Sequence, residues 1–411
     1  MPTSLDPALL AAATARLAAP DAERAARYPG DPGTRQPVHT CYVPADRVDA
    51  GTPAAWGAAA LAALDEHLPS AADLAALLDL DDALAGPVHQ RVREKLAAEP
   101  VEDLRVDFED GYGTRADAAE DADALRAAAL LRGWGLLSSG IRMKSFDTPE
   151  LLTRGLRTLD LLLTELGAPP PGFTITFPKV TMPEQVETLV GVLTLLETAL
   201  GLDRLGFEIQ VETTQAVVDG EGRFAVPRLI AAGSGRVTGL HFGTYDYTAA
   251  CGLGAGSQHL DHPAADFAKH AMQVGAAGTG VRLSDGSTNL LPVGDREVVH
   301  RNWRTHYRLV RRSLRMGYFQ GWDLHPAQLV TRYAAVYAHH LTSAAADGAR
   351  LAAYVARSTG TAVLDEPATA AALALSLRRA VDCGALTADE VVGHCGLGAD
   401  DLTALIERRT R

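Results

Sequence analysis

The sequence predicts an α/β protein built around a (β/α)8 barrel, and two patterns support this prediction. Between about residues 38 and 335, short apolar runs of strand type alternate with longer helical segments rich in alanine and leucine. This alternation favours a parallel sheet covered by helices, and eight repeats favour a closed barrel over an open sheet. Several runs also end on a carboxylate, at the edge where barrel active sites are built. The eight predicted strands are residues 39–44, 104–109, 140–144, 173–180, 207–212, 237–242, 280–283 and 322–325.

Three segments are predicted along the chain. Residues 1–37 form an alanine-rich amphipathic helical arm that ends in a proline- and glycine-rich loop. Residues 38–335 form the barrel, with a long helical insertion at about 52–100. Residues 336–411 are nearly all helical and are not needed to close a barrel. This tail is therefore interpreted as a lid, a clasp between subunits, or both.

Composition excludes several classes of protein. The chain has 411 residues, of which 47% are hydrophobic and 22% charged, as expected for a globular protein. A net charge of -13 argues against a nucleic-acid partner, because phosphate binding needs a basic face. The four cysteines show neither a CxxC pair nor a zinc spacing, which fits a reducing compartment. No signal peptide and no run of membrane-spanning length are recognised, so a cytoplasmic location without membrane contact is expected.

Two carboxylates at neighbouring strand ends predict a metal site. Glu212 ends the fifth predicted strand, and Asp246 follows the sixth. Two carboxylates brought together repel each other unless a cation lies between them, and a hard divalent ion such as Mg²⁺ is the usual solution. The alternative is that each is a helix cap or a solvated loop group.

Other charged residues occupy strand ends as well. Glu109 and Asp110 lie at the end of the second strand, where either an active-site role or a turn of solvated acids is consistent with the sequence. Arg142 lies inside the third strand, where it either forms a structural ion pair or faces an anionic ligand. The planar guanidinium suits a carboxylate.

Short motifs on successive strands resemble those of the HpcH/HpaI aldolase and citrate lyase β-subunit family, in particular its citrate-lyase-β-like and malyl-CoA-lyase-like branch. The resemblance runs from about residue 38 to 380, and the common order of the motifs carries it. The motifs are Tyr42-Val43-Pro44-Ala45-Asp46, Asp107-Phe108-Glu109-Asp110, Ile141-Arg142-Met143, Phe177-Pro178-Lys179-Val180, Val211-Glu212-Thr213, Phe242-Gly243-Thr244-Tyr245-Asp246, Leu324-His325-Pro326-Ala327-Gln328 and Val363-Leu364-Asp365-Glu366-Pro367.

The resemblance implies a barrel of the pyruvate- or phosphoenolpyruvate-binding type and a set of site residues. Glu212 and Asp246 would bind Mg²⁺ or Mn²⁺, and Arg142 would bind the substrate carboxylate. Asp365 would supply an acid/base group, often to the barrel of a neighbouring subunit; a helix N-cap is its structural alternative. Three further residues are expected on the substrate side of the site: Glu109, Asp110 and Lys179.

The implied activity is a Mg²⁺-dependent carbon–carbon lyase or aldolase that acts through an enolate. Its substrate would be a small 2-keto or 3-hydroxy acid, free or as a CoA thioester, and the protein would be a homo-oligomer. The pyruvate aldolases of the family have a histidine just after the second strand, where this chain has Gly111-Tyr112, and this difference favours the lyase branch. Two alternatives stay open: a pyruvate-type aldolase or other barrel chemistry without CoA, and a non-catalytic barrel that binds a metabolite.

Overall fold

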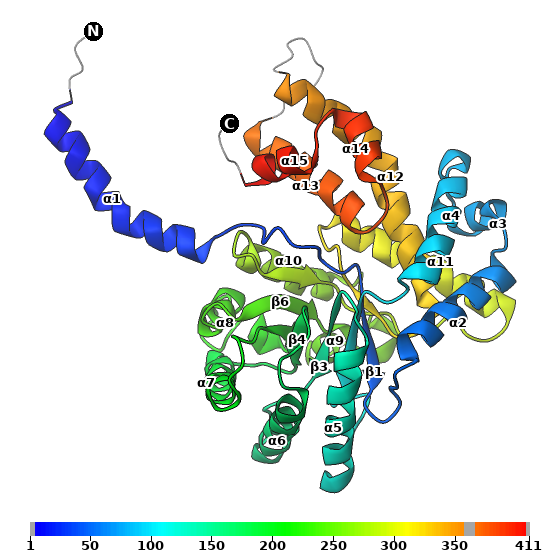
Figure 1. Cartoon of the computed structure of the whole chain (residues 1–411), viewed down its shortest axis with the longest axis horizontal. Coiled ribbons are helices and arrows are strands. Elements are labelled where there is room, and N and C mark those ends of the chain that lie inside the picture. The colour runs from blue at the N-terminus through cyan, green and yellow to red at the C-terminus, as the bar shows by residue number, and fades with distance from the viewer. Residues whose placement is uncertain (1–4, 357–365, 408–411) are drawn as a thin grey trace.

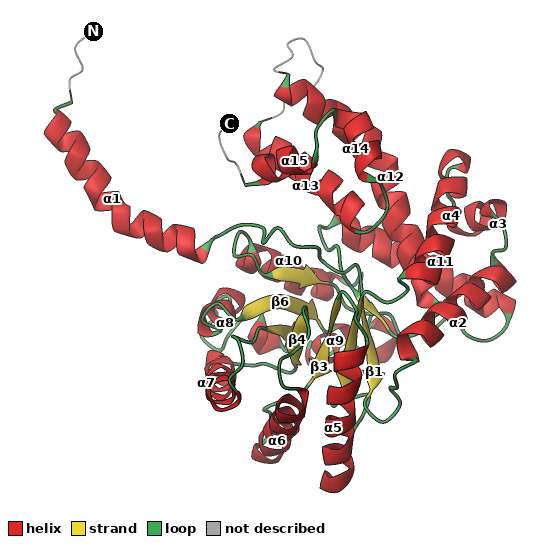
Figure 2. Ribbon diagram, viewed as in Figure 1, coloured by secondary structure: helices red, strands yellow, loops and turns green. Residues whose placement is uncertain are grey.

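The computed structural model describes residues 5–356 and 366–407, and its centre is an eight-stranded parallel sheet surrounded by helices (Figures 1 and 2). The strands are hydrogen-bonded in the order β7-β6-β5-β4-β3-β2-β1-β8. They are β1 (Thr40–Pro44), β2 (Asp103–Asp107), β3 (Ser138–Arg142), β4 (Phe173–Phe177), β5 (Phe207–Val211), β6 (Val237–Phe242), β7 (Arg282–Ser284) and β8 (Trp322–Asp323).

The two ends of this strand order meet and close the barrel. Strand β8 pairs with β1 through Thr40 and Trp322. On its other side, Ser284 at the end of β7 forms a parallel bridge with Gln320. The next backbone N–H, that of Asp285, donates to the carbonyl oxygen of Gln320 at 2.8 Å. The predicted (β/α)8 barrel is confirmed.

Some strands end earlier than the sequence predicted, for local reasons. Strand β4 ends at Phe177 because Pro178 has no N–H to donate and Lys179 adopts a left-handed backbone with φ of 52°. Strand β8 ends at Asp323, since the backbone N–H of Leu324 donates to the side-chain oxygen of Gln328 at 2.7 Å instead of to a neighbouring strand.

Helices cover the barrel and extend beyond it. The predicted insertion contains three of them, and α12 packs against α11, α4 and α13. Within the described ranges, none of the helices has both the length and the apolar character needed to cross a membrane. The helices are α1 (Pro7–Arg27), α2 (Thr52–His67), α3 (Ala71–Leu78), α4 (Asp82–Ala98), α5 (Asp117–Gly133), α6 (Pro149–Leu166), α7 (Pro183–Leu200), α8 (Val226–Ala232), α9 (Thr244–Ala250), α10 (Pro263–Ala276), α11 (Arg296–Arg315), α12 (Gln328–Val355), α13 (Pro367–Asp382), α14 (Ala388–Cys395) and α15 (Ala399–Ile406).

The two faces of the barrel wall differ in chemistry. Successive side chains of a strand point to opposite faces. The outward ones are aliphatic, such as Val106, Ile175 and Leu240, and they are fully buried under the helices. The inward ones include Arg105 and Glu208, which form an ion pair at 3.2 Å. Barrels of this type usually fill their interior with branched aliphatic residues, so the charged interior here is unusual.

The amino-terminal arm leaves the body of the protein. Helix α1 extends away from the barrel in Figure 1 and has no buried residue. The chain then returns along the amino ends of the strands. There the N–H of Gly30 donates to the carbonyl oxygen of Gly278 at 2.9 Å. The side-chain amide of Gln36 donates to the carbonyl oxygen of Leu283 at 3.1 Å. Residues 28–37 are thus fixed against the bottom of the barrel.

All four cysteines lie in the described part of the chain, and none forms a disulfide. Cys41, Cys383 and Cys395 are buried, whereas Cys251 is exposed at the C-terminal end of α9.

Candidate active site

The carboxyl ends of five successive strands bring together most of the residues that the sequence singled out. Each side chain lies at the end of its strand or in the turn that follows, and parallel strands place these positions on one face of the barrel. The residues are Glu109 and Asp110 after β2, Arg142 at the end of β3, Lys179 after β4, Glu212 after β5 and Asp246 in the first turn of α9. Asp365 lies outside the described residues.

Arg142 is held in place by a buried carboxylate. Its Nε and Nη2 donate to the two oxygens of Asp107, both at 2.7 Å, and its Nη1 lies 3.3 Å from Glu109. The guanidinium also stacks 5.0 Å from the ring centre of Tyr42 and 5.8 Å from that of Trp322. Burial opposes the charge of Arg142, but Asp107 and Glu109 hold its pKa well above the ordinary value. The arginine is therefore a fixed, permanently charged group.

Lys179 connects the acidic residues of the site. Its ammonium lies 2.8 Å from Glu109, 2.8 Å from Asp110 and 3.5 Å from Asp246. Its backbone N–H donates to Glu212 at 2.8 Å, a contact made from the left-handed turn after β4. Burial lowers the pKa of Lys179, but the surrounding carboxylates outweigh this effect and raise it above the ordinary value. Lys179 is therefore the cation that contacts the acids of this acidic cluster.

Glu212 is the most deeply buried of these acids, with 1% of the residue exposed. Burial raises its pKa to about 8; Lys179 opposes this rise, while Glu109 and Asp246 add to it. Gly243 makes room for the carboxylate, because a Cβ there would lie 2.3 Å from the Cβ of Glu212. Burial therefore outweighs the stabilisation that Lys179 gives to the charged form of Glu212.

Asp246 is more accessible than Glu212, with 49% of its side chain exposed. It lies in the first turn of α9, where an acidic side chain is favourable near the helix N-terminus. The adjacent Tyr245 accepts a hydrogen bond from the backbone N–H of Asn289 at 2.6 Å. This bond ties the start of α9 to the loop after β7.

The chemistry of these donors fits a hard divalent cation. Glu212 and Asp246 offer carboxylate oxygens, the ligands that Mg²⁺ prefers. Nowhere in residues 5–356 and 366–407 do three or more His, Cys, Asp or Glu side chains form a group that could hold a metal ion. An ion bound by these two residues would therefore take its other ligands from water or substrate, which is usual for Mg²⁺.

Two further residues position the site: the sequence singled out Asp107 only within the motif at the end of the second strand, and it gave no indication of Gln210. Asp107 fixes Arg142, and Gln210 donates through its side-chain amide to Glu212. Each lies two positions before an acid that the sequence did single out, Glu109 and Glu212. Alternate residues of a strand face the same side, so this spacing of two was the available signal.

His325, from the motif at the end of the eighth predicted strand, makes a structural contact. Its Nδ1 accepts the backbone N–H of Ala327 at 3.2 Å in the turn before α12. Burial lowers the pKa of His325, so the ring is neutral at physiological pH.

Comparison with known proteins identifies the family first. Residues 17–410 match the family described as "Domain of unknown function (DUF6986)". The chain belongs to this family. No curated protein matches it.

Solved structures extend the comparison of this DUF6986 chain to the fold. A citrate lyase from Burkholderia xenovorans is 22% identical, with a TM-score of 0.54, over 74% of this chain and 91% of that one. The CitE protein of Mycobacterium tuberculosis, in complex with magnesium, acetoacetate and coenzyme A, is 17% identical. Its TM-score is 0.50, over 86% of this chain and 99% of that one. These proteins share the barrel fold, which confirms the structural side of the predicted resemblance.

Proposed function

We propose that this protein is a Mg²⁺-dependent carbon–carbon lyase or aldolase acting on a small 2-keto or 3-hydroxy acid. The observation that carries the proposal is the pairing of Glu212 and Asp246, both in contact with Lys179, at the carboxyl end of the barrel. Cleaving a bond next to a keto acid or thioester passes through an enolate, whose negative charge must be stabilised. The site combines two carboxylates that can bind a cation with two positive groups, Arg142 and Lys179.

Glu212 and Asp246 would hold the Mg²⁺ or Mn²⁺ ion. When bound, such an ion supplies a Lewis acid and a template for the carboxylate and keto oxygens of a substrate. The two acids have separate parts in this arrangement. Glu212 is fixed by the N–H of Lys179 and by Gln210, whereas Asp246 is more open to solvent. The buried ligand gives the site its position, and the exposed one leaves access for the ion.

The protein's own cations would bind and orient the substrate. Arg142 has two of its nitrogens on Asp107, so it would act through Nη1, which lies toward Glu109. Lys179 would add a second positive charge, held in place by Glu109 and Asp110. Fixed charges of this kind stabilise developing negative charge without reorganising during the reaction. Glu109 and Asp110 would thus act on the substrate indirectly, by holding Arg142 and Lys179 in place.

Proton transfer still needs a base, and Asp365 is the residue proposed for it, acting in a homo-oligomer on a neighbouring subunit's barrel. The fold-level relatives support a keto acid and CoA as ligands to test, because CitE was solved with acetoacetate and coenzyme A. A CoA thioester is therefore included among the proposed substrates.

Calorimetric titration with pyruvate, glyoxylate, oxaloacetate and acetyl-CoA, each with Mg²⁺ and with EDTA, tests the proposal. We expect at least one keto acid to bind with Mg²⁺ and not with EDTA. Binding of acetyl-CoA in addition would select the acyl-CoA lyase branch. If no keto acid binds under either condition, the proposed substrate class is wrong, although the barrel fold stands.

A further inference from the structure

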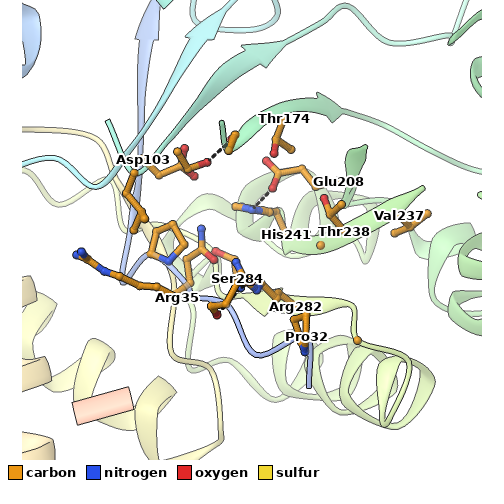
Figure 3. A pocket seen from close by; sticks show the side chains of 18 of the residues that line it. Pro32, Arg35, Asp103, Thr174, Glu208, Val237, Thr238, His241, Arg282 and Ser284 are labelled. Atoms are coloured by element: carbon orange, nitrogen blue, oxygen red, sulfur yellow. Dashed lines mark hydrogen bonds and ion pairs between the residues drawn. The ribbon is translucent and has the colours of Figure 1, made fainter. Parts of the chain in front are cut away.

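A large cavity lies at the opposite end of the barrel from the candidate active site. Its volume is about 710 Å³, within the range of small-molecule sites. Residues near the amino ends of the strands line it, together with the segment 29–37 that runs beneath them (Figure 3). The lining includes Asp103 from β2, Thr174 from β4, Glu208 from β5, His241 from β6 and Arg282 from β7.

The inner wall of this cavity is a network of paired polar groups. Arg105 contacts Asp103 and lies 3.2 Å from Glu208. Glu208 also lies 2.8 Å from Nε2 of His241, and the two side chains meet in Figure 3. Because these buried groups satisfy one another, the wall is rigid and offers a polar surface of fixed shape.

The outer wall contains positive charge that is not fully paired. Arg282 donates through Nη2 to the carbonyl oxygen of Thr34 at 2.6 Å and to the hydroxyl of the same threonine. Within the described chain no ion pair joins Arg282 to a carboxylate. A guanidinium has five N–H donors, so most of the donors of Arg282 remain available.

Two further arginines lie beside Arg282. Arg378 contacts Asp31 at 2.5 Å, and Arg379 lies 3.9 Å from the same carboxylate. The second acid nearby, Asp382, lies 3.9 Å from Nε of Arg378, an atom that is buried without a hydrogen-bond partner. Arg378 and Arg379 thus share two carboxylates while Arg282 has no ion pair in the described chain, although the net charge of the protein is -13.

The pKa shifts of these arginines agree with an excess of positive over negative charge around them. Burial lowers the pKa of Arg379 to about 10, with Asp31 opposing the shift and Arg378 and Arg282 adding to it. Burial also lowers the pKa of Arg282, again with a contribution from Arg378. A second cavity of about 220 Å³, lined by Arg282 and Arg379, adjoins the first along the segment 30–32. An anion could therefore reach both arginines.

We propose that the amino end of the barrel binds a small anionic metabolite. Its carboxylate or phosphate contacts Arg282, and its polar body occupies the cavity beside Thr174 and Glu208. A planar guanidinium recognises either oxyanion by paired hydrogen bonds. The segment 29–37 forms one wall of the site, so the bound molecule contacts the arm as well as the barrel. This inference is independent of the proposed reaction at the other end.

Direct binding measurements on the full chain test this proposal. Inorganic phosphate, citrate, ribose 5-phosphate and AMP are titrated calorimetrically and by thermal shift. We expect at least one to bind and to raise the melting temperature, with an affinity that falls as salt increases. Tighter binding of ribose 5-phosphate or AMP than of inorganic phosphate would show that the cavity holds the body of the ligand. Tighter binding of citrate would indicate a carboxylate ligand.

Variants locate the binding. Arg282→Gln should reduce affinity at least tenfold, and Arg282→Lys should retain part of it, because lysine keeps the charge without the planar fork. Arg308→Gln, an exposed arginine paired with Asp261, is the matched control and should bind like the parent. Glu212→Gln should also bind these anions normally, which separates the two ends of the barrel. Unchanged affinity in a folded Arg282→Gln variant, or no binding of any probe to the parent protein, would overturn the proposal.

Discussion

The two ends of the barrel have opposite electrostatic character. At the carboxyl end, five carboxyl groups surround two cations, Arg142 and Lys179. At the amino end, Arg378 and Arg379 share Asp31 and Asp382, and Arg282 lies near them without an ion pair in the described chain. One end therefore favours an added cation and the other an added anion. The difference teaches that one barrel can place an excess of acidic residues at one end and a cluster of arginines at the other.

The largest effect is expected from removing a metal ligand at the carboxyl end. Glu212→Gln or Asp246→Asn should lower Mg²⁺-dependent turnover about a thousandfold or more, since the Lewis acid contributes several kcal/mol. Mg²⁺ titration, and steady-state rates with whichever keto acid binds in the calorimetric titration, measure the loss. Asp117→Asn, with 83% of the parent side chain exposed, is the control. Full Mg²⁺ binding and activity in either ligand variant would show that the acidic end does not hold the ion.

The next prediction compares Arg142, which forms an ion pair with Asp107, with Arg282, for which the described chain contains no ion pair. Arg142→Ala should destabilise the protein by about 3–5 kcal/mol, because Asp107 is left buried without its partner. Urea unfolding measures the difference. Arg282→Gln should cost only about 1 kcal/mol, since it removes the hydrogen bonds to Thr34 but no ion pair. Equal losses for the two variants would mean that the amino end is as well neutralised as the carboxyl end.

A smaller effect is expected at the lysine inside the acidic cluster. Lys179→Met should tighten Mg²⁺ binding about tenfold, because an ammonium 3.5 Å from Asp246 repels an arriving cation. Lys179→Arg keeps the charge and should bind Mg²⁺ like the parent. Calorimetric titration of both variants sharpens the comparison, and weaker Mg²⁺ binding by Lys179→Met would contradict it.

The smallest predicted effect is a pH dependence of the stability, caused by His340, which lies near the arginines of the amino end. Burial, with His339 and Arg379, lowers the pKa of His340 from 6.5 to about 3. Between pH 6.5 and 3, His340 is protonated in the unfolded chain but neutral in the folded one. The free energy of unfolding is therefore highest above pH 6.5 and decreases as the pH falls below that value. The slope is at most about 1.4 kcal/mol per pH unit.

His340→Phe should flatten this acid slope, because the ring stacks on Phe319 and needs no charge there. Urea unfolding at pH 7.5 and 5 measures the change. His270→Gln, whose parent histidine is exposed, should keep the parent slope. An unchanged slope in His340→Phe would show that this histidine is not the group that titrates.

The sequence predicted the barrel because each strand carries its own apolar signal and the strands follow one another in space. It also placed Glu212 and Asp246 at the same face, since parallel strands end together. The predicted end of β4 was wrong because Pro178, together with the left-handed backbone of Lys179, interrupts a run whose apolar pattern predicts a longer strand.

The cluster of Arg282, Arg378 and Arg379 could not be predicted from the sequence. Asp31 precedes both Arg282 and Arg378 by hundreds of residues, and the three carry no shared motif. Only the return of residues 28–37 beneath the barrel, together with the position of α13, brings them into contact. Contacts of this kind depend on tertiary packing, which local periodicity does not encode.

The exposed thiol of Cys251 gives the protein a natural position for spectroscopic labelling. The other three cysteines are buried, so a maleimide fluorophore would attach at one place without any engineered residue. That place is the end of α9, the short helix whose first turn carries Asp246. Five residues of helix correspond to roughly 7.5 Å along its axis. A dye at Cys251 would therefore report events at Asp246 by a change in its emission while leaving every proposed ligand intact.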